Sequence, residues 1–182
     1  MSIQTPFQRV DIWDLLIPKI QPSVDLYRKS LLDDGSYESQ HREYFRPDRL
    51  IFLDGVIQSR RTGDASYHEA LVHPVMFAHD NPKRVAIVGG GECATLREVL
   101  KHKTVEKVVM IDIDELMVKT SIEYLPEWSD CSNLEGSSKV CVDDPRAELF
   151  YLDAFAWFTD RFLNDENEHN EEPFDVIIMD AL

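Results

Sequence analysis

The sequence of 182 residues predicts an α/β fold, in which helices cover both faces of a parallel β-sheet. Two observations lead to this prediction. Beyond residue 80, strongly apolar runs alternate with segments of helical periodicity. Before residue 80, that alternation is absent and the clearest signal is a β-hairpin at residues 50–59. We therefore predict a small N-terminal hairpin segment over residues 1–80 and a sheet domain over residues 81–182.

The N-terminal hairpin is predicted from the dipeptide Asp54-Gly55, which separates two apolar runs within residues 50–59. Asp-Gly readily adopts the positive φ angles of a two-residue type I′ turn. The residues before the hairpin give no firm assignment, because prolines interrupt them. Two stretches there, Trp13–Ile17 and Val24–Leu32, fit either short helices or strands.

A helix is predicted to begin at Tyr67, ahead of the sheet domain. Ser66 and Glu69 stand three residues apart and form a possible capping box, in which each side chain bonds to the backbone N–H of the other residue. Pro74 has no backbone N–H and clashes with the preceding turn of a helix. We expect it to kink this helix or to break it.

The sheet domain is predicted to contain four strands and three helices in alternation. The strands are Arg84–Val88, Lys107–Ile111, Ala147–Leu152 and Phe174–Met179, and the helices are Glu92–His102, Asp114–Tyr124 and Asp153–Leu163. Two stretches are rich in polar or acidic residues and are predicted to be solvated loops, namely Ser129–Pro145 and Asp160–Glu172.

The composition restricts the classes of partner. Nineteen Lys and Arg against 34 Asp and Glu give a formal net charge of −15, which repels nucleic acids and anionic lipid surfaces. No apolar run is long enough to cross a bilayer, and Asp11 and Asp14 interrupt the only candidate signal peptide. Cys93, Cys131 and Cys141 are an odd number without C-x-x-C spacing. We predict a cytoplasmic protein with reduced thiols and with no nucleic-acid or membrane partner.

The most informative motif is the glycine turn after the first predicted strand, Gly89-Gly90-Gly91, which is part of a G-x-G-x-x-A pattern. Such glycines let the backbone approach a nucleotide, and Asp112 follows about 20 residues later, where a carboxylate can accept both ribose hydroxyls. The alternative is a plain strand–helix turn. Glu92 at the predicted helix start would repel a pyrophosphate but attract an ammonium or sulfonium group. We therefore predict a Rossmann-like nucleoside site of the S-adenosylmethionine type.

Acidic side chains follow each of the four predicted strands, namely Glu92, Asp112, Asp153 and Asp180. The carboxyl ends of parallel strands meet at one edge of the sheet, where open α/β folds bind their ligands. Each acid alone fits a helix cap. Four of them at one edge predict a pocket of concentrated negative charge.

Several segments together resemble the polyamine aminopropyltransferases, the family of spermidine, spermine and thermospermine synthases. The segments are Leu53-Asp54-Gly55-Val56-Ile57-Gln58, Ser66-Tyr67-His68-Glu69, Gly89-Gly90-Gly91-Glu92, Leu96-Arg97-Glu98-Val99-Leu100-Lys101-His102, Asp112-Ile113-Asp114 and Asp144-Pro145-Arg146-Ala147-Glu148-Leu149. Residues 59–69, and glutamate instead of aspartate at position 92, resemble the thermospermine synthase branch in particular.

The resemblance implies a reaction and a set of roles. The family transfers an aminopropyl group from decarboxylated S-adenosylmethionine, a co-substrate, to a polyamine and releases methylthioadenosine, with no further cofactor and no metal. By resemblance, Asp112 would hold the ribose, Ile113 would lie against adenine, and Asp153 with the backbone of Ala154 would read the adenine edge. Gln58, Tyr67, His68 and Glu92 would surround the aminopropyl arm, Asp180 would be the general base, and the chain would form a homodimer.

Departures from the family pattern keep two other functions open. Cys93-Ala94 replaces smaller residues after the glycine turn, and the chain ends two residues after Asp180. We therefore expect a C-terminally truncated sheet with an apolar edge at Phe174–Met179. The alternatives are a methyltransferase that uses S-adenosylmethionine and an inactive nucleoside-binding relative.

Overall fold

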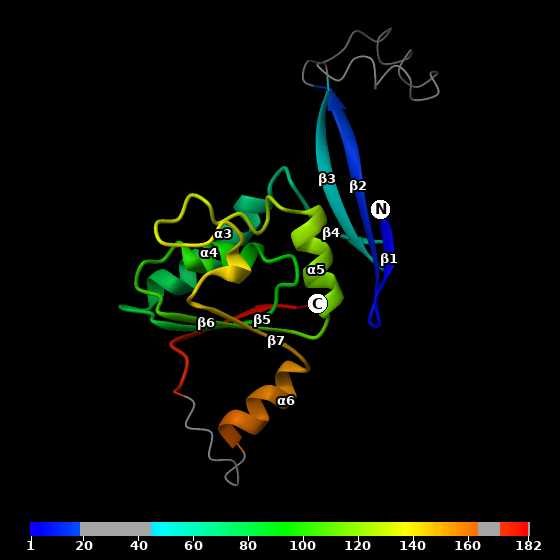
Figure 1. Ribbon diagram of the computed structural model, residues 1–182. Coiled ribbons are helices and arrows are strands. Elements are labelled where there is room, and N and C mark those ends of the chain that lie inside the picture. The colour runs from blue at the N-terminus through cyan, green and yellow to red at the C-terminus, as the bar shows by residue number, and fades with distance from the viewer. Residues whose placement is uncertain (19–44, 164–171, 182) are drawn as a thin grey trace, which may run out of the picture.

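The computed structural model describes residues 1–18, 45–163 and 172–181 (Figure 1). It contains two four-stranded sheets. Strands β1 to β4 form an antiparallel sheet in chain order, and the second sheet is parallel with the order β7-β6-β5-β8. Among the helices of the described residues, none combines the length and the apolar character that crossing a membrane requires. The predicted α/β class with a parallel sheet is confirmed.

The antiparallel sheet forms from the N-terminal segment. Its strands are β1 (Ser2–Gln4), β2 (Arg9–Pro18), β3 (Phe45–Leu53) and β4 (Val56–Arg60). The predicted hairpin is confirmed, because Leu53 pairs with Val56 and both Asp54 and Gly55 have positive φ angles, 49° and 82°. Trp13–Ile17 is part of a strand, whereas Val24–Leu32 lies outside the described residues.

The parallel sheet follows the predicted alternation with small shifts at the boundaries. Its strands are β5 (Arg84–Gly89), β6 (Lys107–Asp112), β7 (Ala147–Tyr151) and β8 (Val176–Asp180), and its helices are α4 (Ala94–Leu100), α5 (Glu115–Tyr124) and α6 (Ala154–Phe158), with a π-helical turn at Thr159–Leu163. Helix α4 begins two residues later than predicted, as does strand β8, and the α-helical part of α6 ends at Phe158 rather than at Leu163. The glycine turn extends through Cys93, whose φ of +69° is not helical.

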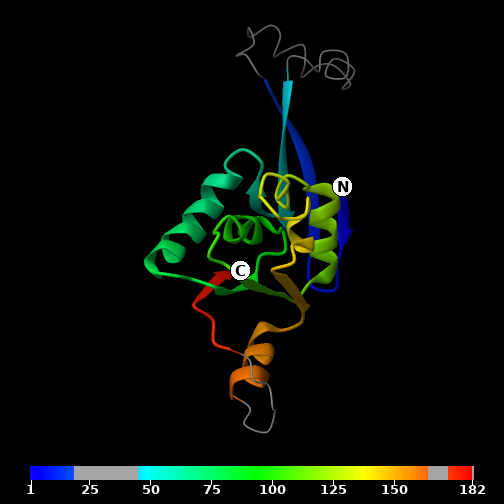
Figure 2. The same ribbon diagram turned by 60° about the vertical axis from the view of Figure 1, so that its left-hand side comes forward.

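Helices cover both faces of the parallel sheet. Helices α3 (Asp64–Ala78), α4 and α5 lie on one side, with α4 between the other two in Figure 2, and α6 lies on the opposite side (Figure 1). On the α6 side, Trp157 packs against Val109 and Ile111 of β6. Strand β8 lies at the edge of the sheet, with Ile177 and Met179 exposed, as the apolar-edge prediction requires.

Helix α3 differs from its predicted form in two ways. It begins at Asp64 rather than Tyr67, and its N-cap is Gly63, which offers no side-chain hydrogen bond, so the predicted capping box at Ser66 is wrong. The helix also continues through Pro74 up to Ala78, so the proline does not break it. Its buried face, which includes Val72 and Met76 on either side of the proline, packs in the main core. This packing offsets the hydrogen bond that proline removes.

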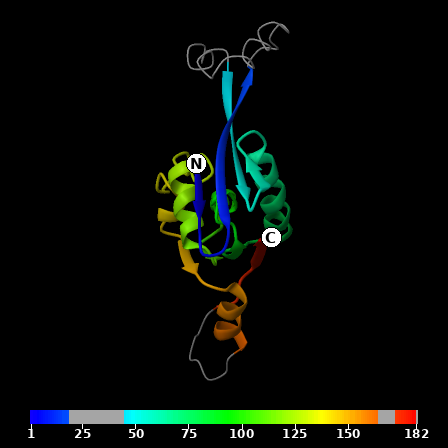
Figure 3. The ribbon, with the colours of Figure 1, turned by 90° about the vertical axis from the view of Figure 1, so that its right-hand side faces the viewer.

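The N-terminal sheet packs against the first residues of α4 and against α5 (Figure 3). Val10, Ile12 and Ile51 form one side of this small core, and Ala94 and Met117 are among the residues on the other side. Burial of these side chains holds the antiparallel sheet beside the carboxyl ends of the parallel strands. Strands β2 and β3 continue away from this contact as a two-stranded arm (Figures 1 and 3).

The segment Ser129–Pro145 corrects two predictions. Cys131 and Cys141 form a disulfide rather than reduced thiols, and both are buried, as are Ser129 and Asp144. The segment is therefore only in part a solvated loop. The prediction relied on the odd number of cysteines, but the chain brings residues 131 and 141 together through the bridge between Asp130 and Val140. Cys93 is the free cysteine of the described residues, and it is buried.

The disulfide gives a direct chemical expectation. In the unfolded and unreduced protein, iodoacetamide should modify Cys93 alone, and after reduction it should modify all three cysteines. Peptide mass spectrometry measures this difference. In the folded protein Cys93 should not react, because burial, and then the charges of Asp112 and Glu92, raise the pKa of its thiol to about 12. Three modified cysteines without reduction would contradict the disulfide.

Candidate active site

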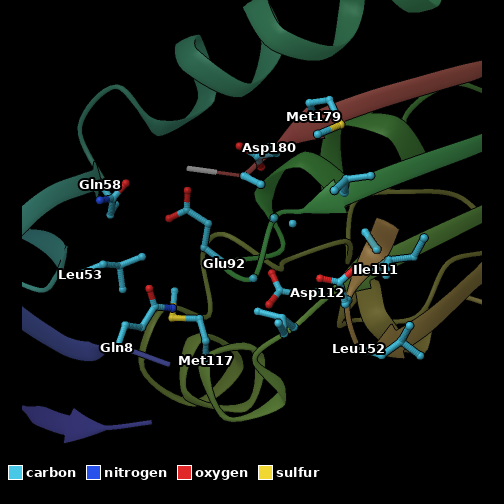
Figure 4. A pocket seen from close by; sticks show the side chains of 18 of the residues that line it. Gln8, Leu53, Gln58, Glu92, Ile111, Asp112, Met117, Leu152, Met179 and Asp180 are labelled. Carbon is cyan, nitrogen blue, oxygen red and sulfur yellow. The ribbon is translucent and has the colours of Figure 1, made fainter. Parts of the chain in front are cut away.

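A cavity of about 390 Å³ opens at the carboxyl ends of the parallel strands, beside the antiparallel sheet (Figure 4). It is lined by Gln8, Leu53, Gln58, Tyr67, Val88, Gly89, Gly90, Gly91, Glu92, Ile111, Asp112, Ile113, Met117, Leu152, Asp153, Ala154, Met179, Asp180 and Ala181. Every predicted site residue except His68 is in this lining. The four acids that follow the strands therefore lie around one cavity.

The glycine turn brings two strand ends together. Gly89 pairs with Asp180 across β5 and β8, and the N–H of Gly90 donates to the carbonyl oxygen of Asp180 over 2.9 Å. At Gly91, an added Cβ atom would stand 3.0 Å from both Asp112 Oδ2 and Met117 Cγ. The turn thus needs glycine for close approach to the acids on both neighbouring strands.

Asp112 lies at the end of β6, where Oδ1 accepts the N–H of Asp114 over 2.8 Å. Burial raises the pKa of the Asp112 carboxyl, and the neighbouring charges of Asp114 and Asp180 add to this effect. Asp153 caps α6, with Oδ1 accepting the N–H of Ala156 over 2.8 Å. Both carboxylates also line the cavity, so the capping role and a role toward a ligand coexist.

Glu92 has one oxygen held by the protein and one without a partner. Oε1 is 3.2 Å from Nε2 of His68, whereas the buried Oε2 has no hydrogen-bond partner among the described residues. A buried carboxylate oxygen without a donor costs free energy, which a ligand donor would recover. Because Glu92 lines the cavity, the geometry fits an ammonium group of a ligand.

Asp180 is held from two directions. The hydroxyl of Thr95 donates to Oδ2 over 2.6 Å, while the backbone of Asp180 is held by Gly90. Tyr67 lines the same cavity as Asp180 and Glu92, and burial first, and then these two negative charges, raise the pKa of its phenol. The cavity therefore has an acidic end, formed by Glu92 and Asp180, and Gln58 is also at this end in Figure 4.

His68 departs from its predicted place. It is fully buried and contacts Glu92 from behind instead of lining the cavity. Nδ1 is 2.9 Å from the carbonyl oxygen of Asp64 and 2.8 Å from its carboxylate. Burial lowers the pKa of His68, but the bonds to Asp64 and Glu92 outweigh burial and raise it to about 10. The sequence pattern places His68 one residue after Tyr67, on the inward side of α3.

The sequence patterns did not identify three residues that line the cavity from outside the parallel sheet. Gln8 lines the cavity and donates to Asp114 Oδ2 over 3.3 Å, and Leu53 and Met117 complete this side. No motif marks Gln8, because it lies in the N-terminal segment that gave no assignment. Met117 belongs to the helical pattern of α5, which is the only signal that it offered.

A second group of potential metal ligands lies outside the cavity, at Glu69, His73 and Glu98. There the ammonium of Lys101 already contacts Glu98 Oε2 over 2.5 Å. The sequence His68-Glu69 followed by His73 also lacks the H-E-x-x-H spacing of a zinc motif. This group gives no support for a metal site.

Comparison with known proteins identifies the family of this chain. Residues 64–182 match the model of the Spermine/spermidine synthase domain. The chain belongs to this family. Polyamine aminopropyltransferase 1 of Hyperthermus butylicus is 50% identical over 132 residues, which are 72% of this chain and 40% of that protein. The polyamine aminopropyltransferase of Thermococcus kodakarensis is 40% identical over 156 residues, 84% of this chain and 50% of that protein.

Solved structures of the family share the fold. The spermidine synthase of Thermotoga maritima has a TM-score of 0.66 at 32% identity and aligns with the whole of this chain, which covers 47% of that chain. A spermidine synthase in complex with the transition state analogue AdoDATO has a TM-score of 0.67 at 32% identity, with 46% of that chain covered. This spermidine synthase family chain therefore spans half or less of the length of these relatives.

The buried histidine of this family member predicts a pH dependence of stability. Because folding raises the pKa of His68 from about 6.5 to about 10, its contribution is complete below pH 6.5 and is lost as the pH rises toward 10. We expect the free energy of unfolding to fall by up to about 1.4 kcal/mol per pH unit in this range. Urea denaturation from pH 6 to pH 9.5 measures this slope. His68→Asn should lack this component, and equal slopes for the two proteins would contradict it.

Proposed function

We propose that the chain provides the nucleoside site and the proton acceptor of a polyamine aminopropyltransferase. The reaction transfers the aminopropyl group of decarboxylated S-adenosylmethionine to an amine of a polyamine and releases methylthioadenosine. Membership of the spermidine synthase family supports this proposal. The observation that carries it is the acidic cavity, in which a buried oxygen of Glu92 has no donor among the described residues. An aliphatic ammonium is the ligand group that fits this oxygen.

The nucleoside is proposed to occupy the part of the cavity near β6 and α6. Asp112 would accept the two ribose hydroxyls, because its Oδ2 faces the glycine turn and its other oxygen is fixed by Asp114. Ile113 is 47% exposed and offers an apolar surface for adenine. Asp153 and the backbone of Ala154 would bind the adenine edge, since one Asp153 oxygen remains after α6 is capped.

The aminopropyl arm is proposed to lie at the acidic end of the cavity. Glu92 would bind its ammonium group through Oε2, and Gln58 and Tyr67 would lie beside the arm. Decarboxylated S-adenosylmethionine carries both an ammonium and a sulfonium charge. Both charges are attracted by Glu92 and Asp180, and neither would be favoured in a site built for phosphates.

Asp180 is proposed to accept the proton of the attacking amine. An amine with a pKa near 10.4 is mostly protonated at neutral pH and cannot attack carbon in that form. As its proton passes to Asp180, the nitrogen lone pair forms a bond to the carbon next to sulfur. The C–S bond breaks, and sulfur retains the electron pair as a neutral thioether. The hydroxyl of Thr95 fixes the carboxylate for this transfer.

The acceptor and the assembly belong to the same proposal. Putrescine would give spermidine, and spermidine would give spermine or thermospermine. The segment 59–69 and Glu92 resemble the thermospermine branch, so we propose thermospermine as one product to be tested. We further propose a homodimer, as the family resemblance implies, and a cytoplasmic location.

The deciding experiment incubates the purified chain with decarboxylated S-adenosylmethionine and either putrescine or spermidine. Mass spectrometry should detect methylthioadenosine together with the extended polyamine, and its fragmentation distinguishes spermine from thermospermine. A parallel reaction with methyl-labelled S-adenosylmethionine tests methyl transfer. Methyl transfer without aminopropyl transfer would overturn the proposal. Binding of methylthioadenosine without either transfer would reduce the function of this chain to nucleoside binding.

A further inference from the structure

We propose that His68 and Asp64 are positioning residues, which hold Glu92 with one oxygen tied and the other presented to the ammonium group of the nucleoside ligand. This inference rests on the proposed function, because it assigns the origin of amine recognition in the same cavity. Neither residue lines the cavity, and both side chains are buried. They act on the ligand only through Glu92.

Both ring nitrogens of His68 face oxygen atoms, an arrangement that favours the doubly protonated ring. Nε2 faces Glu92 Oε1 at 3.2 Å, and Nδ1 faces two oxygens of Asp64 at 2.8 and 2.9 Å. A neutral imidazole has a single N–H and would turn a lone pair toward one of these carboxylates. An imidazolium donates to both. The ring therefore joins Asp64 and Glu92 as a doubly protonated bridge.

Arg97 holds the far end of this bridge. Its Nη1 is 3.0 Å from Asp64 Oδ2 and also donates to the carbonyl oxygens of Glu127 and Trp128, over 3.0 and 3.2 Å. The guanidinium is almost completely buried, so these bonds are poorly screened by water. Asp64 is consequently fixed between two cations, and the position of His68 is set from α4 as well as from its own helix.

The arrangement has a consequence for Glu92. A freely rotating carboxylate would distribute both of its oxygens between a ligand and neighbouring groups. The carboxylate of Glu92 is instead held through Oε1 by His68. Its Oε2 is left without a donor among the described residues before any ligand arrives. Preorganisation of this kind raises affinity by removing the cost of ordering the group. The bridge should therefore favour ligands with an amine over the same nucleoside without one.

The test compares two nucleosides, one with the aminopropyl arm and its amine and one without them. Methylthioadenosine lacks it, and 5′-deoxy-5′-(3-aminopropylthio)adenosine carries it on a neutral thioether. Isothermal titration gives the ratio of their dissociation constants, and we expect the aminopropyl compound to bind more tightly by about tenfold or more. A merely structural role of His68 would change both affinities together. The ratio reports the recognition of the aminopropyl arm, whose charged group is the amine.

Two variants of His68 distinguish the contributions of its two ring nitrogens. His68→Gln keeps a donor at the distance of Nε2, so it should retain part of the ratio. His68→Asn keeps a donor only near Nδ1, so its ratio should fall toward one while methylthioadenosine still binds. Glu69→Gln removes a carboxylate from the next, exposed position of α3 and should leave the ratio unchanged. Circular dichroism confirms that each variant is folded.

The protonation of His68 gives a readout that needs no ligand. The groups that face it are Asp64 and Tyr67 from α3 and Glu92 from the glycine turn, with Arg97 behind Asp64. The ¹⁵N resonances of the ring should show both nitrogens protonated up to pH 8.5. A neutral ring at pH 7.5, or equal ratios in folded His68→Asn and wild type, would overturn the inference. Failure of both nucleosides to bind would instead overturn the proposed function, while the ring resonances would still decide the bridge.

Discussion

Replacing Asp180 with asparagine is expected to reduce aminopropyl transfer at least about a hundredfold, which is the usual effect of removing a general base. Asparagine has the same shape and can still accept the hydroxyl of Thr95, so the site should keep its form. It cannot take a proton from the attacking amine. The measurement is the initial rate of methylthioadenosine release in a form of the protein that carries out the transfer.

The Asp180→Asn result needs a binding measurement and a matched control. Methylthioadenosine should bind to the variant within a few-fold of wild type, because the ribose and adenine contacts are assigned to other residues. Glu148→Gln removes a carboxylate from β7 that lies outside the cavity and pairs with Lys107 on the surface. It should leave the rate unchanged. Wild-type rates in Asp180→Asn would show that another group accepts the proton.

Replacing Gly89 with alanine is expected to destabilise the protein by about 3 to 5 kcal/mol. The added Cβ would stand 2.3 Å from the carbonyl oxygen and 2.8 Å from the carbonyl carbon of Asp180. Both are backbone atoms of β8, so the clash is relieved only by moving the strand. The φ angle of +82° adds strain for any residue with a side chain. Urea denaturation measures the loss.

A second glycine separates the clash from the backbone strain. Gly136 has nearly the same φ angle, +79°, but an added Cβ there would meet no atom within 4 Å. Gly136→Ala should therefore cost only about 1 to 2 kcal/mol. Because Gly89→Ala displaces the strand end that presents Asp180, it should also lose transfer activity in the fraction that remains folded. Equal losses of stability in the two variants would refute the close packing of β5 on β8.

Local sequence patterns were sufficient to predict most of the parallel sheet and the acidic residues at its carboxyl edge. Strands of a parallel sheet are apolar on both faces, so they are visible in the sequence, and the residue after each strand must lie at the carboxyl edge. For this reason the sequence predicts Glu92, Asp112, Asp153 and Asp180 at one edge of the sheet, and all four line one cavity. The Asp-Gly turn was equally local, since its φ angles depend on two residues alone.

Features that depend on distant contacts were mispredicted or missed. Helix α3 begins at Asp64, whose carboxylate is bound by Arg97 of another helix, and a local capping pattern at Ser66 does not contain that contact. The disulfide depends on how the segment around Cys131 and Cys141 folds back on itself.

The sequence by itself thus determined the fold class, the family resemblance and the acids at the edge of the sheet, because each follows from short-range periodicity or from a contiguous motif. Only the tertiary structure decided which side chains face the cavity and which support it. His68 and Tyr67 are adjacent in the chain, yet one is buried behind Glu92 and the other lines the cavity. That difference arises from the packing of α3 against α4 and the glycine turn, which no local pattern encodes.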